Sequence, residues 1–484
     1  MVELVALMLT IGAVMYHSFY TGIETVVYVG ILVALSCALF FRTVRGICFG
    51  LILGATLILG ALALWRIDEP VVGEVYGNRA FDAKVVSVDR RLDRTLLVVR
   101  DVMFDERLQV SVTGVVELLP GDTVTVRGTV APPQDFVTDS GRIFGYQAYL
   151  ASKGIVGLVN NPTVVLVDEG AWSLSRIATI IRYRVADIFA QHISFPFDGV
   201  IAGMLVGYQG GLPQSVQDLF RDTGVLHVLV LSGYNITLLA GFLGLLLRAL
   251  PFRIRTILTV IAILMLVLVS GAGVASVRAG IMGSIALFAG LSIRTYQPIR
   301  ALFVAYILFF FISPHTVFAD PGFHLSFLAT LFMVAVLPRV EQLFSFIPKT
   351  THVDLRELIM MAVSIPIFML PYTMYFSGSF PLASPLANMV LALVTPVAMI
   401  AGIIIVACAW VVPLAGLVGT ITSLGGRLLL WLLKLSARLP QWQTPALAWW
   451  GVVMIYAGIL GTLFRKDIAT FVMQRYRMLR QRTN

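Results

Sequence analysis

Long apolar runs separated by short polar links dominate this chain. Three of them open the sequence, near 2–19, 24–41 and 46–65. Each is close to the roughly 17–25 residues that a helix needs to cross a bilayer. Apolar residues make up 58% of the 484 positions and charged residues only 13%, whereas soluble domains carry about 25% charged residues. These runs exclude an ordinary soluble fold, and they predict a polytopic α-helical membrane protein.

The apolar runs return in the second half of the chain. They lie near 197–208, 224–248, 253–272, 274–292, 299–313, 323–338, 356–376, 386–411 and 446–464. Within 412–438, Arg427, Lys434 and Arg438 are spaced as in an interfacial or re-entrant helix. We therefore predict about 10–12 membrane segments, accompanied by amphipathic interfacial helices.

The stretch 67–170 differs from the rest because polar and apolar residues alternate in it. Short strands are predicted at FDAKVVSV (81–88), TLLVVRDV (95–102), RLQVSV (107–112) and TVTVRGTV (123–130). Four or five such strands suit a small closed barrel such as an OB-fold, with a β-sandwich as the alternative. The amphipathic pattern of 175–193, within 171–195, then predicts an interfacial helix, or a linker helix packed on the protein surface.

The distribution of charge predicts the topology. The 24 Lys/Arg outside residues 66–170 lie mostly between apolar runs and in the tail 465–484, as in cytoplasmic loops. We expect both termini to be cytoplasmic and the β domain to lie outside the plasma membrane. The predicted domains are transmembrane helices over 1–66, the β domain over 67–170, the interfacial helix over 171–195, a membrane domain over 196–464 and the basic tail.

Several classes of chemistry lack their sequence signatures. Cys37, Cys48 and Cys408 all lie in apolar runs, so we expect no disulfide framework and no metal cluster. No G-x-x-x-x-G-K-[ST] loop and no H-E-x-x-H motif occurs, and the six histidines are scattered. We therefore expect no enzymatic activity, no cofactor and no metal, and we look for a path for a solute or polymer instead.

The first candidate site is FRDTGVLHVLVLSGYNITLLAG, at 220–241, where His227, Ser232, Gly233, Tyr234 and Asn235 interrupt an apolar run. On one continuous helix, His227, Ser232 and Asn235 form a single polar wedge. The pair Ser232-Gly233 can also break the helix beside a water-filled path. Hydrogen bonding between helices is the structural alternative.

Three more polar positions occur in apolar surroundings. Arg278, in GAGVASVRAGIMGS, would attract phosphates if it lines a passage, with snorkelling to the interface as the alternative. In HTVFADPGFHLSFLATL, Asp320 can cap the helix that carries His324 and Ser326, and a core role for His324 is the alternative to a site role. Asn388 follows a Pro-broken re-entry, at 372–396.

These segments together resemble the ComEC family of bacterial competence DNA channels. Phe220, Gly224, His227, Ser232 and Gly233 occupy that family's F-x-x-x-G-L-x-H-L-L-x-x-S-G-L-H pattern. VRAGIM, DPGFHLSFLAT and SPLANMVLALVTP are similar to its later elements, and PPQDFVTDSGRIFGYQAYLASKGIVG (132–157) to the end of its outer domain. Asn235 and His324 depart from the pattern, which has histidine and glutamine there.

The resemblance implies import of one DNA strand across the plasma membrane of a bacterium during natural transformation. It implies membrane lipids as surroundings, and as partners a periplasmic or surface DNA receptor, a separate nuclease and a cytoplasmic ATP-driven motor or single-strand binding protein. A small-solute or lipid-precursor transporter with broken helices is the alternative function.

The outer domain would bind DNA if its cations share one face, because 11 Lys/Arg are opposed by 15 Asp/Glu over residues 66–170. The cations in question are Arg79, Arg90, Arg91, Arg94, Arg127, Arg142 and Lys153. Phe144, Tyr146 and Tyr149 are candidates for stacking on bases, with core packing as the alternative for each.

Overall fold

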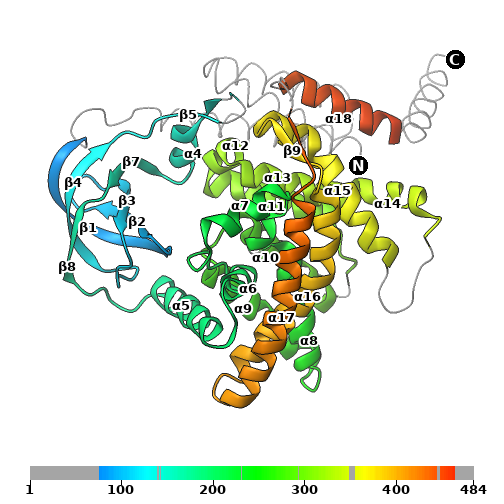
Figure 1. Ribbon diagram of the computed structural model, residues 1–484, viewed down its shortest axis with the longest axis horizontal. Coiled ribbons are helices and arrows are strands. Elements are labelled where there is room, and N and C mark those ends of the chain that lie inside the picture. Colours follow the sequence, from blue (N-terminus) through cyan, green and yellow to red (C-terminus); the bar gives the residue numbers. More distant parts are fainter. Residues whose placement is uncertain are drawn as a thin grey trace.

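A computed structural model describes residues 76–463, except 139–140, 142, 231, 293, 348–354, 444–446 and 448. The predicted N-terminal helices over 1–66 and the tail over 465–484 lie outside the described residues. Within them, a β barrel lies at one side of a larger helical body (Figure 1). The fold is therefore that of a polytopic helical protein with a small barrel domain, as the sequence predicts.

Six strands of the barrel domain form one sheet. They are β1 (Gly77–Arg90), β2 (Arg94–Asp101), β3 (Arg107–Thr113), β4 (Thr123–Ala131), β7 (Ile155–Asn160) and β8 (Thr163–Asp168). The order β1-β2-β3-β7-β4 closes on itself because β4 also pairs with β1. All the pairings in this ring are antiparallel except that of β3 with β7. The closed barrel is confirmed, and the sandwich alternative is wrong.

The barrel core follows from the alternation seen in the sequence. Along β2, Thr95, Leu97, Val99 and Asp101 are buried while the residues between them are more exposed. A strand turns successive side chains to opposite faces, so one face fills the barrel. The two buried polar residues have partners, because the Thr95 hydroxyl donates to Gly114 O and Asp101 pairs with Arg79.

The predicted amphipathic helix is α5 (Leu174–His192), which joins the barrel to the helical body. Arg176 donates to Asp122 on the barrel, and Arg182 donates to Val269 O at the end of helix α9 (Phe252–Val269). Tyr183 donates to Val88 O over 3.0 Å. Burial raises the pKa of Tyr183 to about 12, so its hydroxyl keeps the proton that it donates. These contacts favour the linker alternative over an interfacial role.

Helices make up the rest of the described chain. The first group comprises α6 (Phe197–Val206), α7 (Gln214–Asp222), η1 (Leu226–Leu229), α8 (Gly233–Leu246), α9 (Phe252–Val269), α10 (Val274–Leu291), α11 (Pro298–Ile312) and α12 (Pro314–Ala319). The second comprises α13 (Pro321–Leu331), η2 (Phe332–Val336), α14 (Leu337–Val340), η3 (Glu341–Phe344), α15 (Leu355–Phe376), α16 (Ser384–Ala407), α17 (Val412–Ser436) and α18 (Trp449–Leu463). Among the described residues, six helical stretches are long and apolar enough to cross a membrane.

Helix α17 corrects one prediction. The stretch 412–438 is not re-entrant, because α17 is a continuous helix of 25 residues that packs along α16 and is long and apolar enough to cross a membrane. The strand β10 (Gln441–Gln443), just after α17, pairs with β9 (Ser379–Pro381), just before α16. The two helices therefore run antiparallel over the same span of the body (Figure 1). Of the charged residues that suggested an interfacial helix, Arg427 and Lys434 lie in the second half of α17 and Arg438 lies just after it.

In α9 and α15, basic residues and barrel contacts occupy opposite ends of the helix. Helix α9 begins beside Arg253 and Arg255 and ends at Val269, which accepts from α5 of the linker. Helix α15 begins beside Arg356 and ends at Phe376, whose ring contacts Phe144 of the barrel domain. The starts of α9 and α15 thus define a basic end of these helices, away from the barrel, whereas Lys434 and Arg438 lie at the end that carries β9 and β10.

Candidate functional site

The segment 220–241 is broken, and this changes one prediction. Gly224 takes a left-handed φ of +71°, η1 follows as a short 3-10 helix, and α8 begins only at Gly233. Ser232 caps α8 by accepting from Asn235 N. The predicted break at Ser232-Gly233 is therefore present, but the single wedge that includes His227 is wrong. His227 belongs to η1, and its side chain is exposed.

Asn235 and Tyr234 have opposite surroundings although they are neighbours on α8. Asn235 is only 1% exposed, and its Nδ2 donates to Met204 O near the end of α6 over 2.9 Å. This bond between helices is the structural role that the sequence left open. Tyr234 is exposed. The first turn of α8 is thus anchored on one side and accessible on the other.

Arg278 is buried between helices. It lies in the second turn of α10, is 7% exposed, and its guanidinium stands 6.0 Å from the ring centre of Phe327 on α13. A β-carbon on Gly233 would be 3.2 Å from Arg278 Nη2, so α8 also touches it. Snorkelling is wrong for this residue, because its side chain is enclosed by protein. Within the part of the chain described, Arg278 Nε has no hydrogen-bond partner and no carboxylate neutralises the charge.

Asp320 and His324 have structural partners. Asp320 caps α13 by accepting from Gly322 N over 2.8 Å, as predicted. His324 Nε2 lies 2.8 Å from Val317 O, and Nδ1 lies 2.7 Å from the Tyr372 hydroxyl. Because a carbonyl only accepts, Nε2 carries the proton and the tyrosine donates to Nδ1. His324 is therefore a satisfied core histidine, and Tyr372 is the partner that the sequence did not single out.

Ser326 and Asn388 remain from the predicted set. The Ser326 hydroxyl is buried, and it has no hydrogen-bond partner among the residues that the structure describes. Asn388 Nδ2 donates to Ser384 O and Oγ, back along its own helix. Ser384 also closes the space beside Gly224, where a β-carbon would come within 2.8 Å of its Oγ. The segments 220–241 and 372–396 are thus packed together.

The four predicted segments meet in one ring of helices. Helix α8 contacts α10, α10 contacts α13, α13 contacts α15, α15 contacts α16, and α16 returns to α8. We call α8, α10, α13, α15 and α16 the five-helix ring. Sequence alone cannot give this closure, because it depends on contacts between residues more than 100 positions apart.

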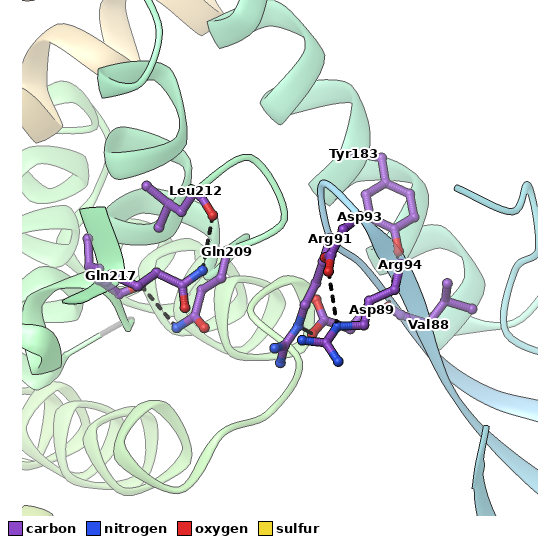
Figure 2. Close-up of polar contacts among 10 residues, drawn as sticks. Val88, Asp89, Arg91, Asp93, Arg94, Tyr183, Gln209, Leu212 and Gln217 are labelled. Atoms are coloured by element: carbon purple, nitrogen blue, oxygen red, sulfur yellow. Dashed lines mark hydrogen bonds and ion pairs between the residues drawn. The ribbon is translucent and has the colours of Figure 1, made fainter. Parts of the chain in front are cut away.

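Several barrel cations have acidic or aromatic partners. Arg79 pairs with Asp101, Arg91 with Asp89 and Arg94 with Asp93. Figure 2 shows the last two pairs at the turn after β1, beside Gln209 and Gln217 of the helical body. Arg90 lies over the ring of Tyr183, whereas Arg127 is exposed and Lys153 stands over the ring of Tyr149. Arg142 lies outside the described residues. DNA binding by a basic face of this set stays a prediction, and acidic partners oppose Arg79, Arg91 and Arg94.

Metal chemistry finds no support in the described residues. No group of three His, Cys, Asp or Glu side chains in them is close enough to hold a metal ion. The buried polar atoms, the broken helix before α8 and the five-helix ring together define the class of this protein. It is a membrane-embedded helical body that carries a barrel at one end.

Comparison with known proteins gives the family. The family described as Competence protein matches residues 204–467, which is more than half of the chain. The chain therefore belongs to the competence protein family, the ComEC family that its motifs resemble. The ComE operon protein 3 of Bacillus subtilis (strain 168) is 25% identical over 219 residues, 43% of this chain. The match spans only 27% of that relative's length, and no solved structure matches. The family supports a role in competence.

Proposed function

We propose that this protein is a plasma-membrane channel that imports single-stranded DNA into the bacterial cytoplasm during natural transformation. Family membership supports uptake of DNA as the process. The five-helix ring supports a channel, because it gathers the polar and broken segments of an otherwise apolar body. That the channel carries DNA, and that this DNA is single-stranded, are parts of the proposal.

The buried charge of Arg278 is the observation that carries the proposal. An ionised side chain within a membrane helix is costly and usually marks a pathway or a binding site. Arginine also matches phosphate geometry through its forked donors. Arg278 lies between α8, α10 and α13, three members of the ring, and no carboxylate of the described residues opposes it. A DNA phosphate would supply the missing negative charge.

The two ends of the helical body support an orientation. Short basic loops stay on the cytoplasmic side of a membrane. Because the basic ends of α9 and α15 are opposite their barrel-facing ends, the barrel would lie outside, where DNA arrives. We also propose that both termini are cytoplasmic, as the distribution of Lys and Arg in the sequence predicts.

Energy and strand processing would come from other proteins. The chain has no nucleotide-binding P-loop motif. A cytoplasmic motor or single-strand binding protein would therefore pull or trap the strand, and a separate nuclease would remove its complement. The channel itself would perform no chemical step.

Import assays with charge-reversed variants test the proposal. A transformable strain lacking the gene would carry the wild type, Arg278→Glu, or the control Arg184→Glu, which reverses an exposed arginine of α5. We expect Arg278→Glu to lower import of labelled DNA into the cytoplasm by roughly tenfold or more, about 1.4 kcal/mol. DNA bound at the cell surface and protein in the membrane should stay unchanged. Normal import by cells lacking the protein would disprove a channel role.

A further inference from the structure

The connection between the fourth and fifth strands of the barrel reaches the helical body. After β4 it forms β5 (Phe136–Val137), β6 (Ile143–Phe144) and α4 (Tyr146–Ser152), then returns to β7. Helix α4 packs on α12, where Thr316 donates to Ser152 O over 3.4 Å. Figure 1 shows α4 and β5 between the barrel and the helices. In OB-type barrels this connection is one of the loops that contact oligonucleotides.

Six aromatic rings continue from this connection into the end of α15. They are the rings of Phe136, Phe144, Tyr146, Tyr149, Phe376 and Tyr372, which we call the aromatic ladder. The ring centres of Phe136 and Phe144 are 5.2 Å apart, and Phe144 lies 5.6 Å from Phe376. Phe376 and Tyr372 are nearly parallel, at 2° and 6.4 Å. The ladder therefore joins the barrel to the five-helix ring.

The ladder is accessible in a way that a closed core is not. Phe136 is 50% exposed, and the other five residues are partly exposed. The contact between the two domains thus covers these rings only in part. Their accessible surface can instead receive flat apolar groups of a ligand.

The charge beside the ladder suits an anionic ligand. Lys153 Nζ lies 4.2 Å from the ring centre of Tyr149, and Arg107 approaches the carbonyl of Lys153. The nearby carboxylate of Asp135 accepts from Gln147 N at the start of α4. Aromatic rings interleaved with cations are the usual surface for single-stranded nucleic acid, which stacks its bases and leaves its phosphates near the cations.

The ladder also continues towards Arg278. The Tyr372 hydroxyl donates to His324 on α13, and the ring of His324 is 6.1 Å from that of Phe323. Phe323 stacks on Phe327 at 4.1 Å, and Phe327 is the ring that faces Arg278. A line of rings thus leads from the exposed Phe136 to the buried charge.

We propose that the aromatic ladder is a nucleobase-stacking site for single-stranded DNA at the junction of the barrel and the membrane helices. It rests on the proposed function and names where the strand is held before it reaches Arg278. The bases stack on the accessible rings, and Lys153 and Arg107 neutralise the phosphates. Stacking on aromatic rings tolerates any sequence, as a general import route requires.

Binding by the full-length protein in nanodiscs tests the ladder. The probes are a fluorescent oligothymidine and an abasic oligonucleotide of equal length and charge. We expect the abasic probe to bind more weakly, and Phe136→Leu and Phe144→Leu each to weaken oligothymidine binding by about 5- to 150-fold. Phe136→Trp should restore binding. Phe346→Leu is the matched control, since Phe346 is exposed and stacked on Phe344 at the basic end.

Two outcomes would overturn the stacking-site proposal and leave the channel proposal intact. Equal binding of the two probes would mean that bases do not stack there, and equal binding by the leucine variants would leave the rings as a contact for lipid or protein. Import measured in cells separates the two proposals. If Arg278→Glu blocks import while the ladder variants bind and import normally, the channel stands and the ladder falls. If no variant changes import, the channel proposal falls whatever the binding result.

Discussion

The barrel and the helical body each bury an arginine, and they treat it differently. Arg176 on α5 meets the barrel carboxylate of Asp122, which also accepts from Leu119 N and Gly170 N at 2.8 and 2.9 Å. Arg278 on α10 meets the ring of Phe327 and the small residue Gly233. Across the described residues, no carboxylate stands beside Arg278.

This difference sets a structural charge against the charge that we propose to be functional. A buried ion pair with its hydrogen bonds complete holds its elements in one arrangement, and breaking it is costly. An ionised side chain in a membrane helix is costly, and it usually marks a pathway or a binding site. The Arg176–Asp122 pair therefore stabilises the joint between α5 and the barrel, which we call the barrel joint. In the five-helix ring, no carboxylate of the described residues pairs with Arg278.

Removing the Asp122 carboxylate should give the largest loss of stability. In Asp122→Ala, Arg176 is left buried and unpaired, which costs about 3–5 kcal/mol. The apparent melting temperature of the detergent-solubilised protein would show the loss. Asp93→Ala is the control, because its pair with Arg94 is exposed and exposed pairs contribute about 0–1 kcal/mol. Equal shifts for the two variants would mean that the Asp122 pair is no stronger than a surface pair.

Replacing Arg278 in the five-helix ring should have the opposite effect on stability. Arg278→Met keeps the length of the side chain and removes a charge without a partner, so stability should stay level or rise by about 1–4 kcal/mol. Import of DNA should fall at the same time. A melting temperature lowered as far as that of Asp122→Ala would show that Arg278 is structural, and the comparison would fail.

The barrel joint should weaken in acid. Burial alone would raise the pKa of Asp122, but hydrogen bonds from Gly170, Arg176 and Leu119 outweigh it and hold the pKa below the usual 3.8. A lowered pKa stabilises the fold above 3.8, and this contribution is lost as the pH falls through the native value. The difference in melting temperature between wild type and Asp122→Asn should therefore be full at pH 7 and shrink below pH 3.8. A difference independent of pH would contradict this assignment.

Crowding Arg278 should have the smallest effect on stability. In Gly233→Ala the new methyl group meets Arg278 Nη2 at 3.2 Å, while the helix gains the better propensity of alanine. We expect a net change within about 1 kcal/mol, together with reduced import because the guanidinium is displaced. Gly241→Ala serves as control, since its β-carbon meets nothing within 4 Å and import should be normal. Unchanged import in Gly233→Ala would mean that the position of Arg278 is not critical.

Features governed by neighbouring residues could be predicted from the sequence. The barrel strands follow from alternation along 81–130, and the caps at Ser232 and Asp320 follow from residue types placed just before apolar helices. The prediction of a re-entrant helix at 412–438 was wrong because it relied on the spacing of three basic residues. The apolar run itself is long enough to form one helix that crosses the body. The wedge at 227–235 failed because His227 lies in η1, which ends at Leu229, and Ser232 caps a separate helix, α8.

The sequence by itself determined the membrane body, the barrel and the broken helix before α8, because each depends on spacing or capping within about twenty residues. Only the tertiary structure decided which polar groups are satisfied. His324 is hydrogen-bonded to Tyr372, Asn235 to Met204 O, and Asp122 to Arg176. Arg278 instead faces an aromatic ring. Packing of distant helices sets these partners, and the same packing aligned the rings of two domains into one ladder.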